Sequence, residues 1–64
     1  MKTVNQTIEY FGEELTYEVH ENGKMVEEGY GWDVDLWFGY SVTTVEIENW
    51  GDENEQIIKL YLSK

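Results

Sequence analysis

The chain contains no cysteine, no proline and no arginine, and only four lysines oppose its fourteen carboxylates. Without cysteine the fold can have neither a disulfide bond nor a zinc site built on thiolates. A domain of 64 residues must therefore gain its stability from apolar packing, helped where needed by oligomerisation. Ten aromatic residues supply large buried areas for that purpose. We expect a single domain over residues 1–64, as a monomer or a homodimer.

Long apolar runs are missing as well. No segment approaches the ~20 apolar residues that a transmembrane helix needs. The opening stretch MKTVNQTIEYF has no apolar run after its one lysine, whereas a signal peptide would have one. These absences predict a cytoplasmic protein that has no membrane partner.

The negative charge is concentrated in one part of the chain. All fourteen acids lie between Glu9 and Glu55, where one lysine, Lys24, against fourteen carboxylates gives a net charge of −13. Direct binding of nucleic acid needs the opposite sign, so we expect none. A basic partner is the natural complement of such a surface. The simpler interpretation is that the charge only keeps the protein in solution.

Residues 3–11 alternate between two sets of side chains, with Val4, Ile8 and Tyr10 on one side. A period of two residues is typical of a strand, so this segment is predicted as β-structure. Residues 12–14 then form a short turn.

A β-hairpin is predicted over residues 15–30. Its first strand alternates cleanly, and Asn22-Gly23 is the strongest short hairpin signal, because both turn positions need positive φ. The predicted pairs are Glu21 with Lys24, His20 with Met25 and Val19 with Val26. On this register Leu15, Tyr17 and Val19 face the core, and Tyr17 and Leu15 meet Glu28 and Tyr30.

A second hairpin is predicted over residues 41–63. Val45 and Ile47 share one face of its first strand, and Glu46 and Glu48 share the other. The second strand turns Ile58, Leu60 and Leu62 inward and Ile57, Lys59 and Tyr61 outward. The alternative is a helix that begins at Asp52 with Glu55 in a capping box, but the alternation favours a strand.

The segment GYGWDVDLWFGY, residues 29–40, connects the two hairpins. As a strand it would put Trp32, Val34, Leu36 and Phe38 on one face. As a helix it would begin at Asp33 and end at Gly39, with Trp32, Leu36 and Tyr40 stacked. In either form we expect Trp32, Leu36 and Tyr40 to pack inward and the aspartates to face solvent. The predicted fold is mainly β, a small antiparallel sheet of four or five strands with room for one short helix near residues 33–39.

Catalytic and metal-binding patterns are weak. His20 is the only histidine and falls on the face opposite Tyr17 and Val19, as a surface residue would. The acidic segment at 52–56 lacks the glycine and the bidentate glutamate of a calcium loop, because Ile57 and Ser63 stand at those positions. We therefore expect no enzyme, no cofactor and no metal site.

Rows of carboxylates are the remaining pattern. Glu46 and Glu48, and Asp33 and Asp35, lie two residues apart, which in an extended chain is ~6.6 Å. Phosphates along a nucleic-acid strand follow one another at a comparable spacing, 3.4 Å of helix axis per nucleotide. Trp37 or Phe38 could add an apolar anchor. The predicted partner-binding residues are Glu27, Glu28, Asp33, Asp35, Trp37, Glu46, Glu48, Asp52, Glu53 and Glu55.

In size, charge imbalance and lack of cysteine, the chain resembles the small acidic proteins that phages and mobile elements direct against host defence, including anti-CRISPR and anti-restriction DNA mimics. The resemblance rests on bulk properties of the whole chain and on no motif. It implies an inhibitor that works in the host cytoplasm and occludes the DNA- or RNA-binding surface of a basic host protein or complex. The alternative is a small acidic accessory or structural module that binds a protein partner mainly through exposed aromatics.

Overall fold

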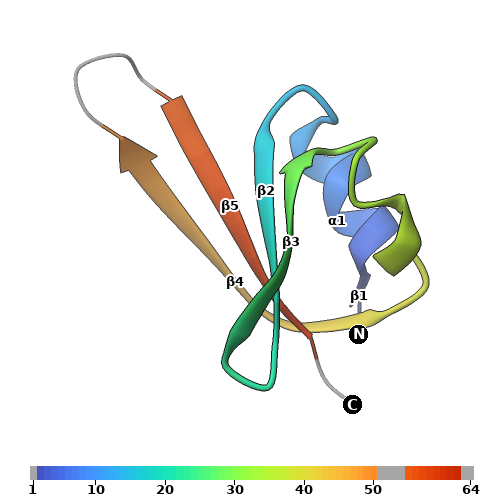
Figure 1. The fold of residues 1–64 in the computed structure, drawn as a ribbon. Helices are drawn as coiled ribbons and strands as arrows, with labels where there is room; N and C mark the ends of the chain where they lie inside the picture. Colours follow the sequence, from blue (N-terminus) through green and yellow to red (C-terminus); the bar gives the residue numbers. More distant parts are fainter. Residues whose placement is uncertain (1, 51–54, 63–64) are drawn as a thin grey trace.

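The computed structural model describes residues 2–50 and 55–62, which form one sheet with a helix on one side (Figure 1). In chain order the elements are β1 (Lys2–Thr3), α1 (Val4–Phe11), β2 (Thr16–Glu21), β3 (Lys24–Tyr30), the 3-10 turn η1 (Asp35–Trp37), β4 (Ser41–Trp50) and β5 (Glu55–Leu62). Within the described residues the sheet has five strands in the order β1-β4-β5-β2-β3. The predicted mainly β, mostly antiparallel fold is confirmed.

The two hairpins meet at the centre of the sheet. β2 pairs with β3 and β4 pairs with β5, both antiparallel. β5 then lies parallel to β2, which is the one parallel pair among the described strands. The far ends of β4 and β5 extend beyond α1 (Figure 1). We call the face of the sheet that packs against α1 the inner face, and the opposite one the outer face.

The core lies between α1, the connection after β3 and the inner face of β2 and β5. Two backbone hydrogen bonds fasten the connection to the helix, from Val4 N–H to the Tyr40 carbonyl (2.9 Å) and from Asn5 N–H to the Phe38 carbonyl (3.2 Å). The buried apolar residues are Val4, Ile8, Tyr17, Val19, Val34, Val42, Ile58 and Leu60. This set confirms that Tyr17, Val19, Ile58 and Leu60 face inward.

The prediction of a strand over residues 3–11 is wrong, because residues 4–11 form α1. The Thr3 hydroxyl accepts a hydrogen bond from Gln6 N–H, and the Gln6 side chain accepts one from Thr3 N–H. This capping box satisfies N–H groups that a helix start otherwise leaves without partners. Val4 and Ile8 lie one helical turn apart and both pack inward, so the same pattern fits a helix as well as a strand.

The β2–β3 hairpin is confirmed, with Asn22 at φ 55° and Gly23 at φ 79° in the turn. Glu21 pairs with Lys24 and His20 with Met25 as predicted. The register then shifts at a bulge, so Val19 lies opposite Glu27 and the predicted partner, Val26, is wrong.

Beyond this bulge every predicted pair is displaced by one residue. The fully buried Tyr17 lies opposite Gly29, which has no side chain, and Tyr30 lies opposite Thr16. The predicted neighbours of Tyr17 and Leu15 are therefore wrong. The shift puts a glycine beside the largest buried side chain of the core.

The segment between the hairpins forms turns around η1, so its helical alternative is realised only as a short 3-10 turn. Val34 is fully buried, and Trp37 and Phe38 are partly buried against the core. Trp32, Leu36 and Tyr40 are exposed instead, so the prediction that they pack inward is wrong. A three-residue turn has no long apolar face, and none of the residues of η1 is fully buried; Val34, the residue before η1, enters the core instead.

The C-terminal hairpin is confirmed. Val45 pairs with Leu60 and Ile47 with Ile58, which puts all four on the inner face. The alternative helix is excluded for residues 55–62, which form β5. A turn is predicted from the sequence GDENE at residues 51–55; Glu55 instead begins β5, and residues 51–54 lie outside the described residues.

Candidate functional site

The outer face of the sheet carries the largest group of carboxylates that the register brings together. One row runs straight across four strands, because Glu46 pairs with Lys59, Lys59 with Glu18, and Glu18 with Glu28. Glu48 lies two residues along β4 on the same face. We call Glu18, Glu28, Glu46 and Glu48 the acidic face; Lys59 is the one lysine among them.

Three of these carboxylates have side-chain partners that hold them in place. Glu46 accepts a hydrogen bond from the Tyr61 hydroxyl at 2.6 Å, and Glu48 forms an ion pair with Lys59 at 2.7 Å between Nζ and Oε2. Glu18 contacts His20 Nε2 at 3.0 Å. The His20 and Tyr61 rings lie 4.9 Å apart, so the supporting side chains also contact each other.

The carboxylates shift the titration of their partners. The hydrogen bond to Glu48 raises the pKa of Lys59, and burial opposes that effect. The hydrogen bond to Glu46 raises the pKa of Tyr61, and desolvation adds to it. At neutral pH both partners therefore keep their protons and remain donors to the acidic face.

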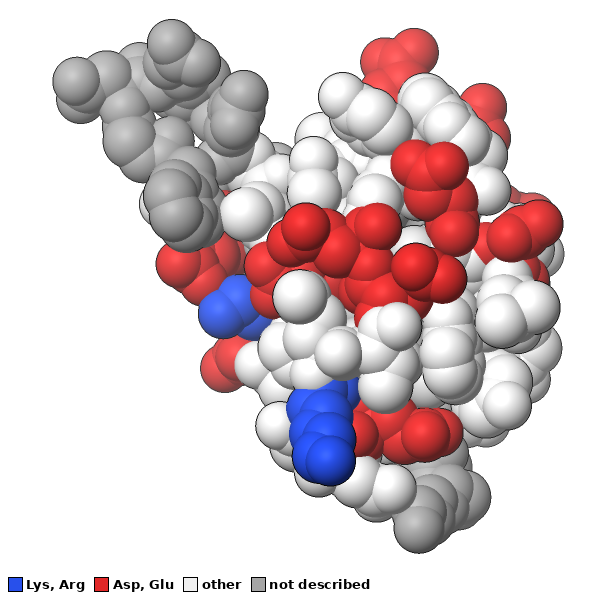
Figure 2. Space-filling view, viewed as in Figure 1, with Lys and Arg blue, Asp and Glu red and all other residues white. Residues whose placement is uncertain are grey.

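Figure 2 shows the same view in space-filling form, with a band of carboxylates across the middle and lysines only beside or below it. No helix of the described chain covers the outer face, since α1 packs on the inner one (Figure 1). The acidic face is thus free of any described helix; the Glu48 side chain is 46% exposed and the Glu18 side chain 15%.

Three predicted partner-binding residues come together on this face, namely Glu28, Glu46 and Glu48. Glu18 was not among the predicted residues, although its place between the inward Tyr17 and Val19 already indicated an outward side chain. Its position beside Lys59 needs the parallel β2–β5 pair, which no local pattern in the sequence indicates.

The other predicted residues lie elsewhere. Glu27 pairs with the buried Val19 and so belongs to the inner face. The Asp33 carboxylate accepts a hydrogen bond from Tyr30 N–H at 3.0 Å, and Asp35 is exposed in η1. Trp37 is partly buried against the core, and its indole N–H is buried without a hydrogen-bond partner in the described structure. Asp52 and Glu53 lie outside the described residues, as does the side chain of Glu55.

Features of other kinds of site are sparse. In the described part of the chain, no three His, Cys, Asp or Glu side chains are grouped so that they could hold a metal ion. Across the same residues, no helix is long and apolar enough to span a membrane. A groove of about 350 Å³ lies between α1 and β4; its surface is mainly apolar, its lining includes Lys2 and three threonines, and it has no carboxylate or histidine.

Comparisons with protein-family models, with curated proteins and with solved structures found no significant match to this chain. The function must therefore be argued from the geometry of the acidic face.

Proposed function

We propose that this protein is an inhibitor that presents its acidic face in place of a nucleic-acid backbone. The observation that carries the proposal is the row of Glu46, Glu18 and Glu28, with Lys59 between the first two, across the outer face of the sheet, which no described helix covers. Neighbouring strands lie about 4.8 Å apart, and same-face residues along a strand about 6.6 Å. Glu18 and Glu28 are thus one strand spacing apart, and Glu46 and Glu18, on either side of Lys59, are two, or about 9.6 Å. A protein groove built for successive phosphates would meet carboxylates at comparable intervals.

The mechanism is association without turnover. A net negative surface draws a basic groove at long range and raises the association rate. The carboxylates held by Tyr61, Lys59 and His20 have little side-chain freedom left to lose on binding, which favours affinity. The proposed partner is a basic nucleic-acid-binding protein or complex of a host defence system, blocked because its DNA or RNA site is occupied.

Charge reversal on and off the acidic face tests the proposal. The bait Glu46→Lys/Glu48→Lys changes the acidic face, while Glu9→Lys/Glu14→Lys makes the same change in net charge at exposed positions on α1 and the following turn. Each bait is used to capture proteins from nuclease-treated host lysate at low salt. We expect the second bait to retain a nucleic-acid-binding protein that the first bait loses.

Two further measurements belong to this experiment. The captured protein should be released by added duplex DNA or RNA, and by 0.5 M salt, where the Debye length falls to about 4 Å. Equal capture by both baits, or binding that survives both salt and nucleic acid, would contradict the proposal.

A second candidate function has its own observation. Tyr30 and Trp32 stack at 4.9 Å between ring centroids and are 48% and 52% exposed, so a large aromatic surface faces solvent after β3. Exposed aromatic pairs of this kind are typical of protein-binding surfaces. A module that binds through them should lose its partner on Trp32→Ala and keep it on Glu46→Lys/Glu48→Lys, the reverse of the result expected for the mimic.

A further inference from the structure

The edge of β4 is open over most of its length. β1 pairs only with Ser41 and Val42. After a register shift at Thr43, β4 pairs with β5 on one side from Thr44 to Trp50, and from residue 43 to residue 50 it pairs with no described strand on the other. Eight residues of extended chain span about 26 Å, and their unpaired N–H and C=O groups are a template for another strand. We call residues 43–50 the free edge.

The two sides of the free edge differ in character. Val45 and Ile47 lie on the inner face and are 37% and 51% exposed, although their partners Leu60 and Ile58 are completely buried. Glu46 and Glu48 lie on the outer face. A strand added here would meet apolar side chains on one side and carboxylates on the other.

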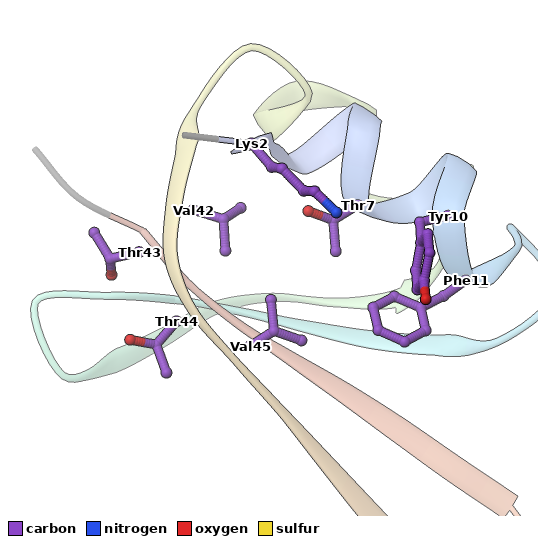
Figure 3. A pocket seen from close by; sticks show the side chains of 8 residues that line it. All are labelled: Lys2, Thr7, Tyr10, Phe11, Val42, Thr43, Thr44 and Val45. Carbon is purple, nitrogen blue, oxygen red and sulfur yellow. The ribbon is translucent and has the colours of Figure 1, made fainter.

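A mainly apolar groove continues the inner side of the free edge; Lys2 also lines it, with its ammonium nitrogen 4.8 Å from the centre of the Tyr10 ring. Figure 3 shows Tyr10 and Phe11 of α1 facing Val42 and Val45 of β4 across it. Tyr10 is 73% exposed and meets Phe11 edge to face at 5.0 Å. Apolar side chains of an added strand that point inward beside Val45 would enter this groove.

The opposite edge of the sheet is protected against such pairing. β3 has the bulge opposite Val19 and His20, and it carries the adjacent charges Glu27 and Glu28. Bulges and charged side chains are the usual means by which sheet edges avoid new partners. β4 has a register shift of its own between Val42 and Thr44, at the start of the free edge, but from Thr44 to the end of the strand its register with β5 runs without a shift.

A second copy of the chain is a poor occupant. The two antiparallel self-registers that pair most of the free edge place Glu46 opposite Glu46 or Glu48 of the other copy. Like charges directly opposite each other on neighbouring strands are destabilising. The charge of the outer side calls instead for lysine or arginine in the added strand.

We propose that the free edge of β4 binds an extended segment of a partner protein in which apolar residues alternate with lysine or arginine. The apolar side chains lie beside Val45 and Ile47, and the basic ones beside Glu46 and Glu48. Backbone hydrogen bonds to β4 supply affinity, and this alternation supplies specificity. The proposal does not depend on nucleic-acid mimicry, because its occupant is a peptide strand.

Titration of the ¹⁵N-labelled full chain with a synthetic peptide of alternating valine and lysine, as long as the free edge, tests this proposal by NMR. We expect shift changes and slower amide exchange along residues 43–50 and at the groove. A peptide of the same composition with its lysines in one block should bind at least about tenfold more weakly, because it has the charge without the alternation.

Two matched variants locate the contact. Val45 and Val26 are 37% and 38% exposed on β4 and on β3. Val45→Lys should lower the affinity for the alternating peptide by about tenfold or more, since an inward lysine blocks edge pairing. Val26→Lys should leave this affinity unchanged. Equal binding of the two peptides, shift changes confined to the outer face without protection of β4 amides, or self-association through the same amides would overturn the proposal. The peptide comparison on the unaltered chain stands even where a variant fails to fold.

Discussion

Glu18 and Glu28 lie directly opposite each other on the outer face of the β2–β3 hairpin. Two carboxylates in this arrangement repel each other and weaken the strand pair. Lys59 is the next residue in the same row beyond Glu18, but its ammonium group is bound to Glu48 at 2.7 Å. The hairpin therefore keeps an unfavourable charge pair in the middle of the acidic face.

Neutralising Glu28 should stabilise the fold. We expect Glu28→Gln to raise the free energy of unfolding by about 0.5 kcal/mol, because it removes one charge of a directly opposed pair. The gain should shrink in high salt, which screens exposed charges. Urea denaturation at low and high salt measures it, with Glu14→Gln as a control of equal charge change in an exposed turn. A Glu28→Gln protein no more stable than the control would show that the repulsion is negligible.

Gly31 is buried where the connection after β3 passes the start of the turn before β2. Its N–H donates to the Glu13 carbonyl at 2.9 Å. A Cβ at Gly31 would lie 2.6 Å from Glu13 Cα and 2.9 Å from Ile8 Cγ2. Neither neighbour is the end of a flexible side chain, so the backbone has to move.

Gly31→Ala should therefore lower the free energy of unfolding by roughly 1–3 kcal/mol through overpacking. Gly39→Ala is the matched control, since a Cβ there meets nothing within 4 Å, and its effect should stay within about 0.5 kcal/mol. Thermal denaturation of both variants gives the comparison. Equal stability of the two would mean that the contact between Gly31 and Glu13 relaxes without loss.

The parts of the fold that depend on residues close together in the sequence were predictable. Asn22-Gly23 specifies its turn through backbone preferences alone, and the alternation around Ile58 and Leu60 separates the two faces of β5. The helix was not predictable in this way, because Val4 and Ile8 satisfy both periods. The capping box of Thr3 and Gln6 favours the helix over the strand. Its contribution can be compared with that of the strand pattern only when the core against which α1 packs is known.

The acidic face needed more than local patterns. The charge excess and the outward positions of Glu46 and Glu48 were visible in the sequence. Glu46 and Glu48 share a face with Glu18 because β5 lies between β4 and β2 in the sheet, which is a long-range pairing. The bulge of β3 at Val26, between the pairs His20–Met25 and Val19–Glu27, also decides the face of each later residue in β3, since a shift of one residue exchanges the two faces. Adjacent strand residues such as Glu27 and Glu28 point to opposite faces in any case; the bulge puts Glu28, rather than Glu27, on the outer face opposite Glu18.

The capping box of α1 should make a measurable contribution to stability. Thr3→Ala removes the hydroxyl that accepts from Gln6 N–H at 3.2 Å, and we expect a loss of about 1 kcal/mol in the free energy of unfolding. Thr3→Ser keeps an acceptor at the same place and should retain most of the stability. If both variants lose the same amount, the methyl group of Thr3, rather than the cap, is what α1 requires.

Tyr17 makes the stability of the fold depend on pH in the alkaline range. Its side chain is fully buried, and its hydroxyl donates to the Gly12 carbonyl at 2.6 Å. Burial disfavours the phenolate and raises the pKa of Tyr17 from 10.0 to about 12. In the unfolded chain the residue ionises near its ordinary value, so between these pH values unfolding releases a proton. The stability that Tyr17 contributes is thus complete below pH 10 and is lost as the pH rises toward 12.

Tyr17→Phe should therefore flatten the alkaline end of the stability curve. A difference of two pKa units corresponds to about 3 kcal/mol, which the wild-type protein should lose progressively above pH 10 and the variant should not. At pH 8 the variant should be less stable by about 1 kcal/mol, because the Gly12 carbonyl loses its donor. Urea denaturation across this pH range measures both effects. Tyr10→Phe, at a tyrosine that is 73% exposed, should keep the wild-type slope. Parallel curves for Tyr17→Phe and the wild type would mean that groups other than the buried phenol cause the alkaline loss.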